Sequence, residues 1–328
     1  MLTVGDTVQI NGCSTKKRIL ETSSGCNAFD TVCGGALTNS SIVLIDEPRS
    51  RHYASFLVKY FVAEGVHYNH KILIVDPNAD PKTGILSEIP SRKIVDEKPT
   101  GFPERKVENE EMSIAWRYDK VAKVDSALGS SSKQEATYDF SNFLKDVDAE
   151  VFTEFSFKKL YEKIEKTIRD QETHTKGGGR GGPKKNLLRI VIQNIDSILW
   201  EDRENMGRFL VFLRALLRSS YAIAYITTNS YSTNESIFRV IENCADVNVQ
   251  LECFNEEEKK TFRGMGTVHG YFRLKSLPRL AALGMHCPPI MDLIFEAQSR
   301  KGFQIRIMHL PPALDEPSPS SKPCNIDF

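Results

Sequence analysis

The strongest constraint on the fold is a strand, helix and strand pattern in the first quarter of the chain. Residues 41–45 (SIVLI) and 71–75 (KILIV) are short apolar runs, and each is followed by a turn signal that contains proline. Between them, residues 51–64 carry apolar side chains at helical spacing, and Gly65 is predicted to end that helix. Two adjacent parallel strands need a long crossover connection, so the pattern predicts a βαβ unit in a parallel sheet.

The same alternation returns from residue 156 onward. Helical spacing is found at 156–169, 207–218 and 236–243. Further strands are predicted at 187–192, 222–227, 247–251, 271–274 and 304–309. This order predicts an α/β fold with a doubly wound, mostly parallel sheet and a β-rich C-terminal part, which is the architecture of the nucleoside triphosphatases.

The predicted single domain spans 1–314 and contains two segments without periodicity. Residues 77–155 are rich in proline and acidic side chains and are expected to form a long irregular insertion. Residues 173–186 include the sequence KGGGRGGPKK and are expected to form a flexible basic loop. Residues 315–328, rich in proline and serine, are expected to form a disordered tail.

Composition restricts the partners and the compartment. The 328 residues include 43 basic and 43 acidic side chains, so no global positive field favours nucleic acid and any such binding needs a local patch. The seven cysteines are odd in number and lack CxxC spacing, which argues against a disulfide framework or a zinc ribbon and favours a reducing compartment. No apolar run approaches the about 18 to 20 residues of a membrane helix. A soluble cytoplasmic protein, also present in the nucleus, is expected, with no membrane partner.

Parallel sheets bind ligands at the carboxyl ends of their strands, so the residues after 41–45 are the first candidate site. A phosphate-binding loop there would read GxxxxGK[ST], because its glycines let backbone N–H groups approach phosphate while its lysine and hydroxyl hold the phosphates and Mg²⁺. No glycine stands between Gly35 and Gly65, so this Walker A motif is absent. In addition, Glu47 would repel a triphosphate.

Positive charge follows in Arg49, Arg51 and His52, next to the predicted start of a helix. Two interpretations stay open. The segment is a capping turn with solvated charges, or it is a weak anion site in which Arg49, Ser50 and Arg51 replace the usual loop.

The strand at 187–192 ends in Gln193 and Asn194, with Asp196 two residues further on. In triphosphatases this strand end presents an aspartate to a metal-bound water, and an amide cannot supply that negative charge. Asp196 is therefore a helix cap or turn residue, or it is the metal carboxylate of a divergent ATPase. The degenerate nucleotide site predicted from the sequence comprises Glu47, Arg49, Ser50, Arg51, His52, Asn194 and Asp196.

Two loops are candidates for RNA binding. The basic loop carries Lys176, Arg180, Lys184 and Lys185, and flexible basic loops can grip phosphodiester backbones. The loop at 228–234 offers polar and aromatic side chains that could hydrogen-bond to RNA or stack on it, namely Asn229 and Tyr231. The alternative for both segments is a solvated linker.

Three residues are candidates for contact with a neighbouring subunit. Trp116 and Tyr118 belong to an apolar island within the insertion, and they could anchor an interface or cover an exposed flank of the domain. Arg279 lies in a predicted turn, where it could reach a neighbouring chain or form a surface ion pair of little energetic value.

Several sequence blocks, in this order and across nearly the whole chain, resemble one known family. They are GCNAFDTVCGGAL at 25–37, KYFVAEG at 59–65, SIAWRY at 113–118, IQNIDSILW at 192–200, LPRL at 277–280, HLPP at 309–312 and the closing IDF. The family is that of the fourth subunit of the Elongator complex. The sequence departs from the family pattern at Ala36, where a glycine is usual, and at Asp196 and Ile198, where glycine and proline are common.

The resemblance implies a RecA-like, P-loop NTPase-type fold without working Walker motifs. It implies a hetero-hexameric ring with the fifth and sixth Elongator subunits, which binds tRNA and attaches to the catalytic subcomplex of the first three subunits. The complex starts a carboxymethyl-type modification of the wobble uridine of tRNA. This chain would bind no cofactor tightly and hold no metal, with ATP expected only at the level of the ring. The alternative is a divergent ATPase whose degenerate site drives tRNA release.

Overall fold

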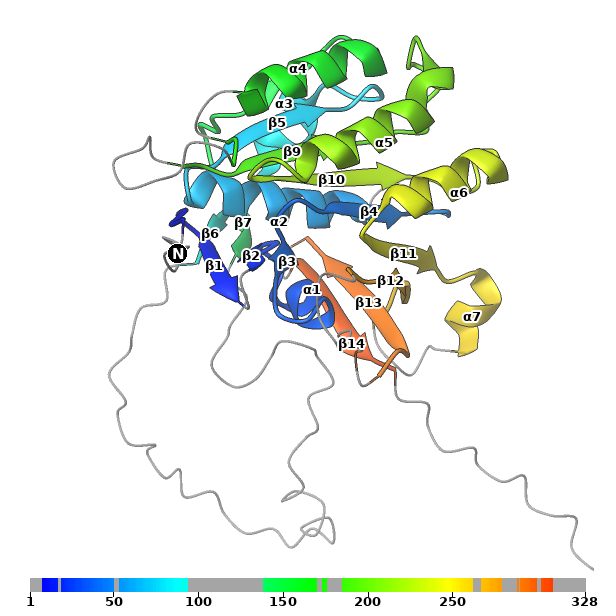
Figure 1. Cartoon of the computed structure of the whole chain (residues 1–328). Helices are drawn as coiled ribbons and strands as arrows, with labels where there is room; N and C mark the ends of the chain where they lie inside the picture. The colour runs from blue at the N-terminus through cyan, green and yellow to red at the C-terminus, as the bar shows by residue number, and fades with distance from the viewer. Residues whose placement is uncertain are drawn as a thin grey trace, which may run out of the picture.

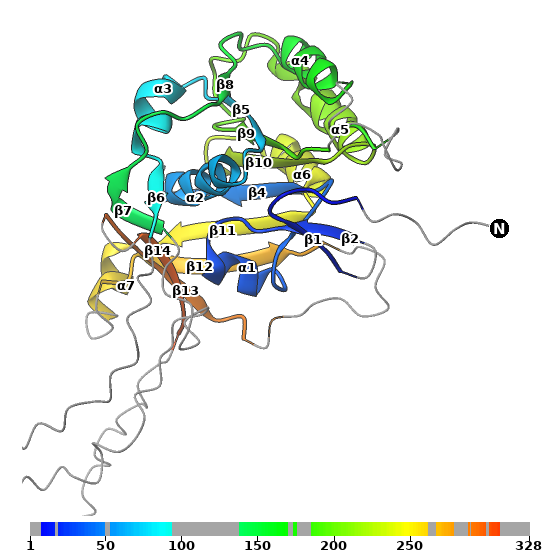
Figure 2. The same cartoon turned by 90° about the vertical axis from the view of Figure 1, so that its left-hand side faces the viewer.

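In the computed structural model of the chain, the structure describes residues 8–16, 19–49, 53–93, 138–169, 173–175, 185–261, 267–278, 288, 290–299 and 302–308. A nine-stranded sheet forms the centre of the molecule, with helices on both of its faces (Figure 1). Two smaller antiparallel sheets flank this core (Figure 2).

Six strands of the main sheet are parallel and follow the order β11-β4-β10-β9-β5-β8. They are β4 (Ile42–Asp46), β5 (Lys71–Val75), β8 (Glu150–Val151), β9 (Leu188–Ile192), β10 (Ala222–Thr228) and β11 (Val247–Cys253). Three antiparallel strands extend the sheet beyond β11, namely β12 (Gly270–Ser276), β13 (Leu293–Gln298) and β14 (Gly302–Ile307). The predicted parallel sheet and β-rich C-terminal part are confirmed.

Alternation along the strands explains why helices cover both faces of the sheet. In β4, Val43 and Ile45 face the cluster formed with α2 (Ala54–His67) and α1 (Asn27–Val32), whereas Ile42 and Leu44 face the opposite cluster. That opposite cluster contains side chains of α4 (Phe157–Arg169), α5 (Met206–Leu217) and α6 (Glu235–Cys244). Continuous apolar runs such as 71–75 predict strands that are buried on both faces of a sheet. Strand β5 has the bounds of this run.

The structure adds elements within 77–155, the span expected to be an irregular insertion. These are α3 (Pro81–Gly84), the 3-10 turn Leu86–Glu88, β6 (Pro90–Arg92) and β7 (Tyr138–Phe143), besides β8. Strand β7 forms because Tyr138 and Phe140 alternate with polar residues and pack against α2, with ring contacts to Tyr60. Its partner β6 lies far away in sequence, so local patterning did not reveal the pair. Trp116 and Tyr118 lie outside the described residues.

Two other differences have clear physical causes. Helix α2 continues past Gly65 to His67, and a Cβ at Gly65 would lie only 2.8 Å from Cδ of Arg189. The glycine thus makes room for a buried arginine and does not end the helix. Strand β13 was not predicted, because Glu296 interrupts its apolar run; this side chain is buried and pairs with Arg306 of β14 at 2.8 Å.

The remaining elements lie around the main sheet. The N-terminal sheet consists of β1 (Cys13–Lys16), β2 (Ile19–Thr22) and β3 (Leu37–Thr38). A 3-10 turn (Arg203–Asn205) precedes α5, and α7 (Glu256–Thr261) follows β11.

A buried arginine ties three of these elements together. Arg189 of β9 is fully buried, and its Nε donates to His70 Nδ1 at 3.0 Å. Its two terminal nitrogens donate to Phe61 O in α2 and to Thr22 Oγ1 and Ser23 O at the end of β2, each at 3.0 Å. Burial, and then the charge of Arg189, lower the pKa of His70 to about 4, so the imidazole is neutral and can accept this hydrogen bond.

Candidate functional site at the carboxyl edge of the sheet

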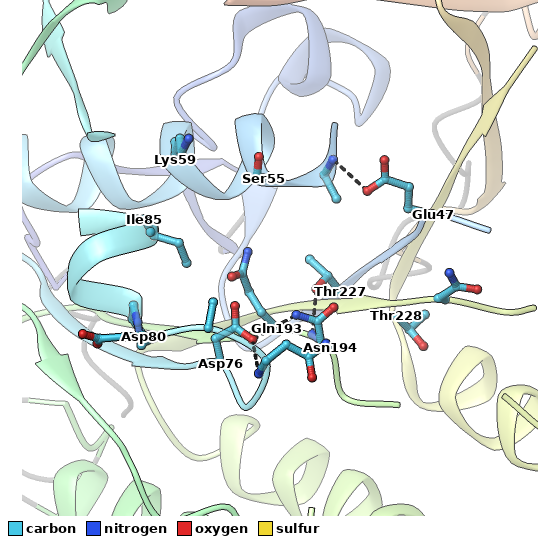
Figure 3. A pocket seen from close by; sticks show the side chains of 16 residues that line it. Glu47, Ser55, Lys59, Asp76, Asp80, Ile85, Gln193, Asn194, Thr227 and Thr228 are labelled. Atoms are coloured by element: carbon cyan, nitrogen blue, oxygen red, sulfur yellow. Dashed lines mark hydrogen bonds between the residues drawn. The ribbon is translucent and has the colours of Figure 1, made fainter. Parts of the chain in front are cut away.

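A pocket of about 370 Å³ lies between α2 and the carboxyl ends of β5, β9 and β10 (Figure 3). These strands end at one edge because they are parallel and in register, with Val75 of β5 and Ile226 of β10 both opposite Ile192 of β9. The polar side chains that line the pocket include Glu47, Ser55, Lys59, Asp76, Asn78, Asp80, Gln193, Asn194, Thr227, Thr228 and Asn229. The pocket lies where a doubly wound sheet binds its ligand.

Glu47 occupies the anion-binding position at the start of α2. Its carboxylate accepts the backbone N–H of Tyr53 at 2.9 Å through Oε1 and that of Ala54 at 3.2 Å through Oε2. A helix N-terminus carries partial positive charge and binds phosphate in nucleotide-binding folds. Here the protein supplies its own anion, and the Glu47 residue is only 2% exposed. A phosphate would have to displace this buried carboxylate.

Arg49, predicted as part of the degenerate nucleotide site, extends away from the pocket. Its guanidinium donates to Cys253 O at 2.8 Å and lies 3.4 Å from Glu252 and 3.5 Å from Glu258, over β11 and α7. The hydroxyl of Tyr231, as a hydrogen-bond partner, raises the pKa of this guanidinium. Ser50, Arg51 and His52 lie outside the described residues.

Asn194 takes part in the pocket through Asp76. Its Nδ2 donates to Oδ1 of Asp76 at 2.9 Å, which joins the end of β9 to the end of β5. The Asp76 residue is 5% exposed. Sequence reasoning missed Asp76, although it directly follows the strand predicted at 71–75. It also missed Ser55 and Lys59, whose four-residue spacing places them on the same side of α2, facing the pocket (Figure 3).

Asp196 does not line the pocket and instead orders the loop after β10. Its Oδ1 accepts the backbone N–H of Asn229 at 3.2 Å, and its Oδ2 accepts the hydroxyl of Ser232. The side chain of Asn229 then accepts the N–H groups of Tyr231 and Ser232. Both carboxylate oxygens of Asp196 are thus used inside the protein, which favours a turn role over a metal ligand. Tyr231, on this ordered loop, is 69% exposed.

The basic loop is described only at its edges. Lys185, predicted to contact RNA, is 6% exposed, and its Nζ donates to the backbone oxygen of His174 at 2.8 Å. The ammonium group of Lys185 is therefore buried, and a phosphate does not reach it. Lys176, Arg180 and Lys184 lie outside the described residues, as does the interface candidate Arg279.

The pocket is rich in carboxylates. Glu47, Asp76 and Asp80 line it, against the ammonium group of Lys59, which pairs with Glu88 at 2.5 Å. Such a lining repels a polyphosphate. Within the ranges that the structure describes, no group of three or more His, Cys, Asp or Glu side chains could hold a metal ion.

Comparison with known proteins identifies the family. The PAXNEB protein family matches residues 11–327, nearly the whole chain. The chain belongs to the PAXNEB family. Among the relatives of this chain, "Elongator complex protein 4" of Homo sapiens is 32% identical, and the match covers 94% of this chain and 81% of the relative. The protein of the same name from Danio rerio is 30% identical, and the match covers 90% of this chain and 82% of the relative. The one from Schizosaccharomyces pombe is 27% identical, and the match covers 90% of this chain and 86% of the relative.

A solved structure, the KaiC-like protein PH0186 from Pyrococcus horikoshii, is 13% identical, with a TM-score of 0.46, and the match covers 88% of this chain and 99% of that one. This PAXNEB chain has a RecA-like sheet, because strands β11-β4-β10-β9-β5 are parallel and helices cover both faces. Over the described ranges, no helix has both the length and the apolar character of a membrane span.

Proposed function

We propose that this chain is a non-catalytic, RecA-like subunit of the Elongator accessory ring. In this proposal, the ring is a hetero-hexamer with the fifth and sixth subunits and attaches to the catalytic subcomplex of the first three. Membership of the PAXNEB family and relatives named Elongator complex protein 4 support the assignment to Elongator. The complex would act in the cytoplasm and also in the nucleus.

One observation carries the non-catalytic part of the proposal. The Glu47 carboxylate accepts the N–H groups at the start of α2, the position at which a phosphate-binding loop would hold a nucleotide. Asp196, the first carboxylate in the sequence after the strand whose end serves triphosphatases, holds a loop. Any ATP binding or hydrolysis by the ring would therefore belong to the other chains.

The proposed contribution of this chain is to bind tRNA and so support modification of the wobble uridine. Tyr231 supports a role in RNA contact, because its exposed ring projects from a loop that Asp196 and Asn229 hold in place. A base could stack on such a preorganised aromatic side chain. The basic side chains Lys176, Arg180 and Lys184 would add contacts to phosphates.

Replacing Lys176, Arg180 and Lys184 together by alanine is expected to weaken tRNA binding by the complex on the order of ten-fold or more. The plot of log affinity against log salt concentration should also become shallower, by about 0.7 to 0.9 for each phosphate that the loop no longer neutralises. Both quantities follow from titrating labelled tRNA with the purified complex at several salt concentrations.

The matched control removes three exposed lysines of α4, by replacing Lys158, Lys159 and Lys166 with alanine. It deletes the same amount of charge from a helix surface outside the loop and should leave affinity and salt dependence nearly unchanged. Equal weakening by both triple variants would point to a general charge effect. An unchanged titration for the loop variant would remove this loop from the proposed tRNA contact.

A further inference from the structure

We infer that the pocket between α2 and the strand ends binds a guanidinium group. The group would come from an arginine side chain of a neighbouring protein chain or from a free guanidino compound. The site is complete within this chain (Figure 3), so the inference goes beyond the proposed tRNA function and does not depend on it.

The charge of the pocket lining favours a cation. Three carboxylates line the pocket, whereas the ammonium group of Lys59 is paired with Glu88. Asp76 is the carboxylate best placed to bind a ligand. Its Oδ1 accepts the N–H of Asn78 and the Nδ2 of Asn194, both at 2.9 Å. Its Oδ2 accepts no hydrogen bond from the part of the chain that the structure describes and is open to the pocket. The pocket therefore favours a cation.

The Gln193 side chain is a second polar group of the pocket that lacks a partner within the described residues. Gln193 lines the pocket, is 7% exposed, and its side-chain amide makes no hydrogen bond with the described residues. Buried polar groups are nearly always paired, and leaving them unpaired costs free energy. A ligand with several donors would satisfy the Gln193 side-chain oxygen together with Asp76.

These observations select among cations. A metal ion would need several carboxylate, imidazole or thiolate ligands brought together, and the described residues contain no such group. An ammonium group is a compact, strongly hydrated point charge, whereas a guanidinium is planar and directs N–H donors in several fixed directions. The acceptors here are spread over two strand ends, at Asp76 after β5 and Gln193 after β9. Such a spread matches the fork of donors on a guanidinium.

The test is a titration of the ¹⁵N-labelled full chain with methylguanidine, followed by NMR. We expect saturable shifts at the backbone amide of Asp76 and at the backbone and side-chain amides of Gln193 and Asn194. Methylammonium should bind at least ten-fold more weakly, and inorganic phosphate should leave these resonances unmoved. The Asp76→Asn variant should lose about ten-fold or more in affinity, because it removes the charge that faces the ligand.

Two further variants keep the inference falsifiable if Asp76→Asn alters the fold. Gln193→Leu keeps the side-chain size and should also weaken methylguanidine binding, whereas Asp292→Asn, at an exposed aspartate outside the pocket, should not. Shifts that never saturate, that are equal in the Asp76→Asn variant, or that phosphate reproduces would overturn the inference.

A second arm identifies the source of the guanidinium once methylguanidine binds. A photo-crosslinking amino acid at Asn78 in the pocket lining would be irradiated in the complex purified from the protein's own cells. A cross-link to an arginine-containing peptide of another chain assigns the group to a neighbouring protein. Methylguanidine binding without such a cross-link assigns the pocket to a free guanidino compound. The absence of both results contradicts the inference.

Discussion

Replacing Arg189 by methionine is expected to lower the free energy of unfolding by about 3 to 5 kcal/mol. The guanidinium donates four hydrogen bonds to Thr22, Ser23, α2 and His70, and the substitution leaves these largely buried acceptors without their donor. The guanidinium also lies 4.5 Å from the centre of the Phe61 ring, so the substitution removes a cation–π interaction as well. Methionine restores part of the volume and none of the donors.

Urea unfolding of the purified chain, followed by circular dichroism, measures this change. Arg208→Met is the matched control, because Arg208 is exposed on α5, and its effect should stay within about 0.5 kcal/mol. Equal midpoints for the two variants would mean that the network around Arg189 contributes little to stability.

Replacing Gly25 by alanine is expected to destabilise the protein by about 2 to 4 kcal/mol. Gly25 has a φ of +86°, a conformation that alanine adopts only with strain, and an added Cβ would lie 2.5 Å from the backbone oxygen of Tyr60. Because that oxygen belongs to α2, the clash would push the helix away from the segment that precedes α1.

Thermal unfolding compares Gly25→Ala with Gly84→Ala. A Cβ at Gly84 meets nothing within 4 Å, and Gly84 lies in the helix α3. Alanine there should be neutral or stabilising by up to about 1 kcal/mol. If the Gly25→Ala variant unfolded at the wild-type temperature, this would contradict the close approach between Gly25 and the backbone oxygen of Tyr60.

The sequence was informative about elements whose causes are local. Continuous apolar runs become strands buried on both faces, and the run at 71–75 forms β5 with those bounds. Pairings between distant segments were not predictable, as for β6 and β7, because nothing in either segment specifies its partner.

The sequence indicates that a candidate site lies at the carboxyl ends of the strands, but it indicates only some of the residues that line the pocket. The absence of a phosphate loop and the strand-end location of Glu47 and Asn194 follow from residue order. The direction in which a long side chain extends depends on its competing partners, and for this reason Arg49 pairs with Glu252 and Lys185 binds the backbone of His174. Asp76 could have been found by applying the strand-end argument to every predicted strand.

The most direct test of the proposed function is the native mass and chain composition of the complex that a tagged form of this protein retrieves from its own cells. We predict a discrete particle close to six times the chain mass of 37.0 kDa, which contains two other RecA-like chains in equal amounts. Larger Elongator subunits should be retained at low salt. A monomer, or an oligomer that contains only this chain, would contradict the assignment to the ring.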